Sequence, residues 1–197
     1  MSRNQMLTQG AHEGFPEIHA NEARGNSRAV SPQQFQGIAG AGARQLGRMQ
    51  KRATGTGGLD RNWERVKDNA FSEVQKPWGG ATVNARSGRT LRQGSNRYAV
   101  TVKPPGTNTV SVPENVSREQ FHTAMDSARQ SFHPTLNMRG GHLGVFRDND
   151  EGRIDIDPAV VVRRTKSVEQ IGAATRNIGG AYHFKSGNGY FPPHVKG

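Results

Sequence analysis

The chain of 197 residues contains no cysteine. Disulfide bonds, thiolate metal sites and cysteine nucleophiles are therefore excluded. Long hydrophobic runs are also missing, both as a signal-peptide core after Met1 and as a segment that could span a bilayer. We therefore expect a soluble protein that is made in the cytoplasm and has no membrane partner.

Apolar residues are scarce as well. They make up 32% of the chain, whereas about 45–50% is usual when glycine is counted with them. This low apolar fraction is more consistent with one core of roughly 100–120 residues than with two domains. The first 30 residues are polar and have no hydrophobic period, so they predict an extended arm that does not order itself.

Acidic side chains are outnumbered by basic ones. The chain has 27 Lys and Arg against 16 Asp and Glu, for a formal net charge of +11. The excess is spread along the sequence, at +4 for residues 1–76, +4 for residues 77–138 and +3 for residues 139–197, so a concentrated polybasic arm is missing. The charge predicts either attraction to DNA, RNA or the acidic face of an assembly, or a solvated arginine-rich surface.

Residues 1–59 are interpreted as an extended arm that carries one glycine-rich helix. Ser31 and Pro32 suit a helix start, and apolar residues recur at helical spacing as far as Met49. Each glycine inside a helix costs up to ~1 kcal/mol, so the four in this segment predict a marginal helix. Four cations at its C-terminal end suit either the helix dipole or a nucleic-acid or other acidic partner: Arg44, Arg48, Lys51 and Arg52.

A second helix is predicted over residues 60–77, with Asp60 as its N-cap. Its apolar stripe includes Trp63 and Phe71, and Trp78 follows it directly. We expect these aromatic residues to dock either on the domain core or on a neighbouring subunit.

Residues 78–197 predict one α+β domain. Ser117 and Gln120 form a capping-box pattern at the start of a helix that we expect Pro134 to stop, and a shorter helix is expected from Ser167. The order β-β-β-α-β-β-α-β-β predicts a mainly antiparallel sheet with two or three helices on one face. The strand-like runs are 81–85, 97–102, 110–112, 142–146, 153–157, 181–184 and 190–191, with a turn at Ser87-Gly88 after the first.

Two histidines are the sharpest candidates for chemistry. His142 and His183 each follow a glycine pair, with Arg139, Tyr182 and Lys185 near them in the sequence. In metal-independent RNA cleavage one imidazole would take the 2′-OH proton, a second acid would protonate the leaving oxygen, and the cations would stabilise the phosphorane. Histidines in a hairpin-rich domain also serve packing, and no fixed spacing decides between the two roles.

Acidic residues of the same region do not match a metal motif. Asp148, Asp150 and Glu151 lack the ligand positions of an EF-hand loop. Asp155 and Asp157 share one face of a predicted strand, where they suit either a magnesium or acid–base site or a half-exposed face beside arginines. We favour the second interpretation and expect neither a metal nor a cofactor.

The C-terminal half carries a run of short motifs: His142 to Phe146, an acidic turn, Ile154 to Pro158, three valines, and Gly180 to Phe184. This order resembles a small domain of tailed phages of actinobacteria, encoded near portal, capsid and MuF-like head-morphogenesis genes or fused to them. The likeness covers roughly residues 78–195. It implies a virion protein made in the host cytoplasm, with capsid, portal or tail subunits as partners and DNA as a further one.

Two functions of different classes follow. The first is a non-enzymatic structural or accessory protein, such as a minor capsid protein, head–tail connector or tail component. Its C-terminal domain would anchor it, and its basic N-terminal arm would lie along neighbouring subunits or packaged DNA. The alternative is a small basic nuclease or toxin-like effector that uses His142 and His183. The arm and the lack of a compact catalytic motif favour the first.

Overall fold

The computed structural model describes residues 28–51, 57–76, 79–175, 181–186, 189–190 and 193–195. The first 27 residues of the predicted arm, Arg52 and Trp78 lie outside this part. The chain divides into two compact units: unit 1 comprises Met1–Gln45, Arg92–Val100 and Val162–Gly197, and unit 2 comprises Leu46–Leu91 and Thr101–Val161. The predicted segments 1–59 and 78–197 therefore each contribute to both units.

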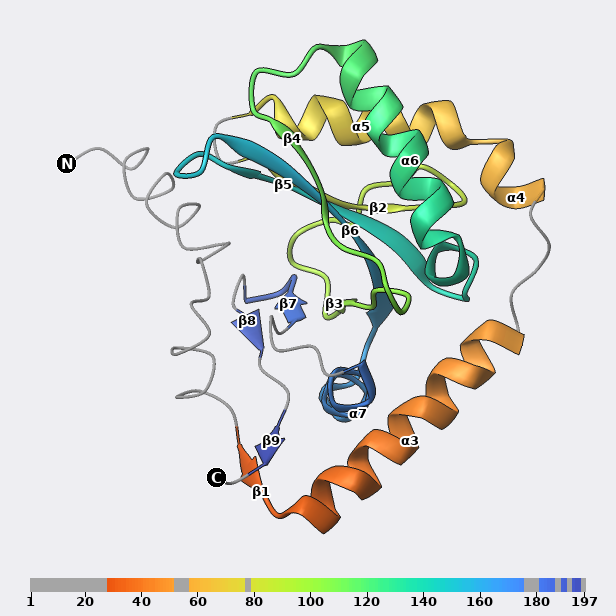
Figure 1. Cartoon of the computed structure of the whole chain (residues 1–197), viewed down its shortest axis with the longest axis vertical. Helices are drawn as coiled ribbons and strands as arrows, with labels where there is room; N and C mark the ends of the chain where they lie inside the picture. Colours follow the sequence, from red (N-terminus) through yellow and green to blue (C-terminus); the bar gives the residue numbers. More distant parts are fainter. Residues whose placement is uncertain are drawn as a thin grey trace. The chain divides into compact units, whose positions relative to one another are not determined.

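Unit 2 is organised around antiparallel strands (Figure 1). β5 (Gly141–Asp148) pairs with β2 (Gly80–Asn84) on one side and β6 (Arg153–Val162) on the other. The short β4 (Val110–Pro113) pairs with the outer edge of β6. Leu143 lies opposite Val83, and Val145 lies opposite Ile156, so apolar residues at alternate positions line one face of the sheet.

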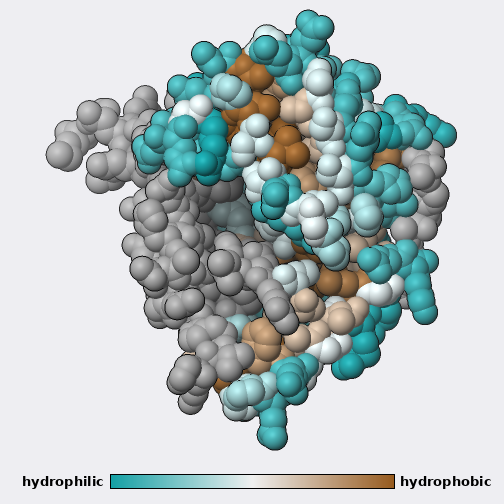
Figure 2. Space-filling view, in the orientation of Figure 1, coloured by the Kyte–Doolittle hydropathy of each residue, from teal (hydrophilic) through white to brown (hydrophobic). Residues whose placement is uncertain are grey.

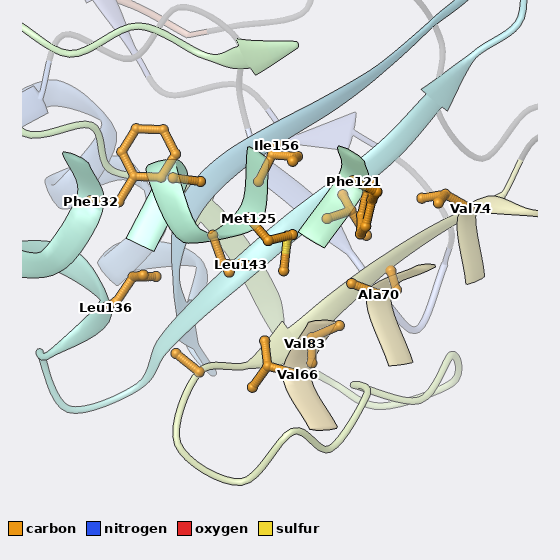
Figure 3. Packing of buried hydrophobic residues seen from close by; sticks show 14 of the residues in the cluster. Val66, Ala70, Val74, Val83, Phe121, Met125, Phe132, Leu136, Leu143 and Ile156 are labelled. Atoms are coloured by element: carbon orange, nitrogen blue, oxygen red, sulfur yellow. The ribbon is translucent and has the colours of Figure 1, made fainter. Parts of the chain in front are cut away.

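Two helices cover that apolar face. They are α5 (Trp63–Val74), which follows the short α4 (Gly57–Asp60), and α6 (Arg118–Leu136). Val66 of α5 and Phe121 and Met125 of α6 are fully buried among the strand residues (Figure 3). Burying each such side chain contributes roughly 1.5–3 kcal/mol. The predicted α+β class and the helices on one face are confirmed.

Unit 1 contains a smaller antiparallel set of strands. β3 (Tyr98–Thr101), β7 (Ala181–His183) and β8 (Gly189–Tyr190) pair in that order, so the last two predicted strand-like runs pair with each other. β1 (Ala29–Val30) pairs in parallel with β9 (His194–Val195) near the C-terminus. The helix α7 (Thr165–Thr175) belongs to this unit, and α3 (Pro32–Lys51) begins in it.

Other local expectations are confirmed at the ends of elements. The Ser117 hydroxyl accepts from the N–H of Gln120, and the Gln120 side chain accepts from the N–H of Ser117, so the capping box opens α6 as predicted. β6 continues through Pro158 as far as Val162, so the valine run extends the preceding strand.

Two local expectations are wrong. Pro134 lies inside α6, which continues to Leu136, because a proline removes only one backbone donor and the last turn forms around it. Asp60 is not the N-cap of α5, because it is the last residue of α4 and its carboxylate pairs with Arg129. The residue before α5 is Asn62, whose side chain makes no capping hydrogen bond. The turn expected at Ser87-Gly88, by contrast, is confirmed: the N–H of Gly88 donates to the carbonyl of Asn84 at 2.9 Å, and β2 pairs with β5.

Candidate functional site

His142 lies on β5, on the face of the sheet opposite Leu143, and is only 6% exposed. Its Nδ1 is 2.8 Å from the carbonyl oxygen of Gly140, and its Nε2 is 3.3 Å from Nδ2 of Asn84. A carbonyl only accepts and an amide NH₂ only donates, so Nδ1–H donates and Nε2 accepts. Both nitrogens of this imidazole therefore have protein partners.

The orientation of Asn84 is fixed independently. Its Oδ1 accepts hydrogen bonds from the backbone N–H of Arg86 at 3.1 Å and from the N–H and hydroxyl of Ser87 at 2.9 and 3.0 Å. These three donors hold the amide oxygen toward the turn after β2 and leave the NH₂ group facing His142. The arrangement is that of a structural histidine that joins a turn to the neighbouring strand.

His183 lies on β7 in a more open setting. Its ring is half-buried and stacks on Tyr98 with a centroid distance of 4.3 Å and an interplanar angle of 12°. Its Nε2 donates to Oδ1 of Asn96 at 3.1 Å, and the hydroxyl of Ser186 lies 2.9 Å from Nδ1. The hydroxyl of Tyr98 in turn lies 3.2 Å from that of Thr165, the first residue of α7.

The residues proposed for RNA cleavage are divided between the two units. His142 and the exposed Arg139 belong to unit 2, whereas His183, Tyr182 and Lys185 belong to unit 1. Burial raises the pKa of the Tyr182 phenol above 10.0, which keeps that side chain neutral over a wider pH range. Its ring lies edge-on to that of Phe184 at 4.9 Å, a packing contact within unit 1.

The acidic turn after β5 has a structural role. Oδ1 of the buried Asp148 accepts from the backbone N–H groups of Asp150 and Glu151 at 3.1 and 3.0 Å, and Gly152 takes a positive φ of 62° to enter β6. Asp148 therefore closes the hairpin between β5 and β6.

The two carboxylates on β6 are both paired. Asp157 accepts from the hydroxyl of Thr109 at 2.8 Å and lies 3.1 Å from Nζ of Lys103. Asp155 accepts from Ser111 at 2.6 Å and from Arg153. This agrees with the interpretation of a half-exposed strand face beside cations. Among the described residues, no group of three or more His, Asp or Glu is arranged to hold a metal ion.

Trp63 is buried within its own unit. It is 3% exposed, its indole N–H donates to Asp126 at 2.6 Å, and the guanidinium of Arg129 lies 5.0 Å from the ring centroid. Phe71 is partly buried and its ring lies 5.4 Å from that of Phe121. The stripe of α5 thus packs on the chain's own core, the first of the two docking alternatives, and Trp78 lies outside the described residues.

Lys67 completes the polar network beside Trp63. Burial on its own would lower the pKa of this ammonium, but hydrogen bonds with Glu64 and Asp126 outweigh it and raise the pKa above 10.5. The lysine therefore stays charged, and with Asp126 it joins α5 to α6.

The cations predicted on the first helix are solvent-exposed. Arg44, Arg48 and Lys51 of α3 are all exposed, and Arg52 lies outside the described residues. The C-terminal end of α3 is capped by backbone: the N–H of Arg139 donates to the carbonyl of Met49 at 3.2 Å.

The two units differ in charge, although the positive charge is spread evenly along the sequence. Among the described residues, unit 2 has fourteen Lys and Arg against twelve Asp and Glu, and most of these acids are in ion pairs. The described part of unit 1 has eight cations against one carboxylate, Glu169, which pairs with Arg28 at 3.8 Å. The eight are Arg28, Arg44, Arg92, Arg97, Arg163, Arg164, Lys166 and Lys185.

Six of these cations, which we call the basic cluster, come from three segments that meet around His183. The cluster consists of Arg92, Arg97, Arg163, Arg164, Lys166 and Lys185. Sequence reasoning missed it because the segments are far apart in the chain. The available signal was the short basic run before Thr165, at the start of a helix.

A partly exposed apolar strip lies on unit 2. Brown, hydrophobic side chains gather over β4 and the adjacent part of α6 (Figure 2), and Val110 and Val112 of β4 are only partly buried. β4 is a short edge strand that ends at Pro113. Short length and a proline both protect the edge of a sheet from pairing with another chain.

Comparison with known families, curated proteins and solved structures finds no match for this chain. In the part of the chain that the structure describes, no helix is both long and apolar enough to cross a membrane.

Proposed function

We propose that this protein is a non-enzymatic structural or accessory component of a multi-subunit particle, and that the particle is the virion of a tailed phage. The assignment to a virion rests on the resemblance of residues 78–195 to phage head-associated modules. The role in an assembly is supported by the surface of α3.

The single observation that carries the proposal is how little of α3 is buried. The helix has 20 residues, and Gly42 is its only buried residue. Phe35, Ile38, Leu46 and Met49 recur on one face, yet each is only half-buried. A surface helix of a globular protein normally buries such a stripe in a core. Gly42 lies at the centre of the same face and packs on α7, so the stripe runs along the chain's own surface, and the part of it that stays exposed supplies apolar area for a neighbouring protein subunit.

The glycines of α3 lie on two sides of the helix. Gly42 has a reason within unit 1, because a Cβ there would lie 1.8 Å from the carbonyl oxygen of Gln170 in α7. Beyond the helix's own backbone, no described residue has an atom within 4 Å of the Cβ position at Gly37 or Gly47, although each glycine costs roughly 1 kcal/mol relative to alanine. Both lie on the side of α3 away from the apolar stripe, where close approach of a neighbouring subunit would account for them.

Incorporation into particles tests this role. We expect Ile38→Glu to abolish or strongly reduce incorporation when the variant complements a phage that lacks the gene, because it places a charge in the proposed contact. Gln36→Glu adds the same charge at an exposed position of α3 and should incorporate normally. Normal incorporation of a folded Ile38→Glu protein would contradict the proposed contact.

The nuclease alternative has no specific observation in its favour. His142, which would have to exchange protons with the substrate, is buried with both nitrogens bonded. His183 is more accessible, but its neighbours are an amide, a hydroxyl and a stacked phenol. The alternative stays a prediction, which RNA and DNA cleavage assays on the purified protein would test.

A further inference from the structure

Hydrogen bonds join the three segments of unit 1 that carry the basic cluster. The N–H of Gly94 donates to the carbonyl of Phe184 at 2.7 Å, and the N–H of Phe184 donates to that of Arg97 at 3.0 Å. These bonds hold the loop with Arg92 and Arg97 against the turn with Lys185. The bond between Tyr98 and Thr165 brings β3 to the start of α7.

Each of the three segments places a cation beside a neutral polar residue. Arg97 follows Asn96, Lys185 precedes Ser186, and Arg164 and Lys166 flank Thr165. The side chains of Asn96, Ser186 and Thr165 are joined through His183 and Tyr98, so the three segments that carry the cations meet at one polar centre. Five of the six are exposed, and Arg97 is half-buried.

The placement of the cations at α7 is unfavourable for the isolated protein. Arg163, Arg164 and Lys166 lie at the N-terminal end of this helix, whose first turn has no acidic residue. The helix dipole is positive at that end, so cations there are repelled by it and by one another. A bound anion would reverse both effects.

We infer that the basic cluster binds the phosphate backbone of a nucleic acid. Four of its six members are arginines, whose planar guanidinium matches phosphate oxygens with two parallel hydrogen bonds. A polyphosphate chain also satisfies cations from three separate segments at once, without requiring a particular sequence. His183, stacked on Tyr98 and hydrogen-bonded to Asn96 and Ser186, links the segments that carry these cations.

This inference deepens the proposed function, because it names the acidic partner of a particle component, but its test does not require particles. The full-length protein is titrated into fluorescein-labelled double-stranded DNA, single-stranded DNA and RNA, and anisotropy is followed at several salt concentrations. Polyglutamate serves as a competitor that has the charge of an acidic protein without its phosphates. Comparison of the three oligonucleotides shows whether the cluster prefers double-stranded DNA, single-stranded DNA or RNA.

We expect Arg163→Glu/Arg164→Glu to weaken binding at roughly 0.1 M salt by about tenfold for each phosphate that the variant no longer binds, and to reduce the log–log salt slope by about one for each. The matched control is Arg61→Glu/Arg89→Glu, which makes the same charge change at two exposed positions of unit 2 and should weaken binding much less. The cluster variant should also melt at a higher temperature, because it removes like charges from the start of α7.

Two results would overturn the inference. Equal weakening by the cluster and control variants would mean that net charge alone attracts the oligonucleotides. Displacement of every oligonucleotide by an equal charge concentration of polyglutamate would assign the surface to an acidic protein instead. Either result would leave the proposed contact through α3, which is measured by incorporation, unaffected.

Discussion

His142 and His183 have the same glycine-rich sequence context but different surroundings in the fold. His142 is held by two hydrogen bonds in a buried site, whereas His183 is half-exposed among polar groups. The sequence predicts both as candidates because a glycine pair followed by histidine carries no information on burial. The partner of His142, Asn84, is 58 residues away, and only the pairing of β2 with β5 brings the two together.

Replacing His142 with alanine should destabilise the protein by about 1–3 kcal/mol, because it leaves the carbonyl of Gly140 and the NH₂ group of Asn84 without this partner. Urea unfolding followed by circular dichroism measures the loss. His133→Ala, the same change at a half-buried position of α6, should cost less. A His142→Ala protein with unchanged stability that has lost an RNA-cleaving activity would contradict the structural role.

At the scale of elements, a helix start is predicted correctly where a complete capping box marks it, as in α6, but not where a single acidic residue suggests it, as Asp60 does for α5. The capping box of α6 depends on two residues three positions apart, and it forms as expected. The end of α6 depends on how a turn with Pro134 packs, and the helix continues beyond it. The same contrast applies to α3: its helical pattern is visible in the sequence, but the role of each glycine depends on what the fold places beside it.

The glycines of α3 should respond in opposite directions to the same substitution. Gly42→Ala should destabilise the protein by roughly 1–3 kcal/mol, because its Cβ would meet the backbone of Gln170 and the two helices would have to separate. Gly47→Ala should stabilise it by roughly 0.4–1 kcal/mol, because no described residue lies against the added methyl group and the helix gains propensity.

Unfolding by urea measures both changes, and Gly37→Ala is a second variant of the stabilising kind. Similar losses for Gly42→Ala and Gly47→Ala would contradict the close approach of α3 to α7 at Gly42. A stabilised Gly47→Ala protein that enters particles less well would support the close approach of a neighbouring subunit to α3 at Gly47.

At the scale of the whole molecule, positive charge that is evenly distributed along the sequence is unevenly distributed between the two units. Successive parts of the sequence carry +4, +4 and +3, and this evenness argues against a concentrated basic site. Unit 1, however, gathers segments from the beginning, middle and end of the chain, and its described residues include a single carboxylate. Contacts between distant segments determine this distribution, so no local pattern in the sequence predicts it.

The central claim is that the protein is a component of a phage particle. Quantitative mass spectrometry of purified virions from the phage that encodes it, with copy number measured against the major capsid protein, tests this most directly. We expect recovery at a fixed ratio that survives washing in high salt, because in the proposed role apolar contacts of α3 as well as charge would hold the protein in place. Absence from purified particles, or a ratio that falls toward zero with washing, would contradict it.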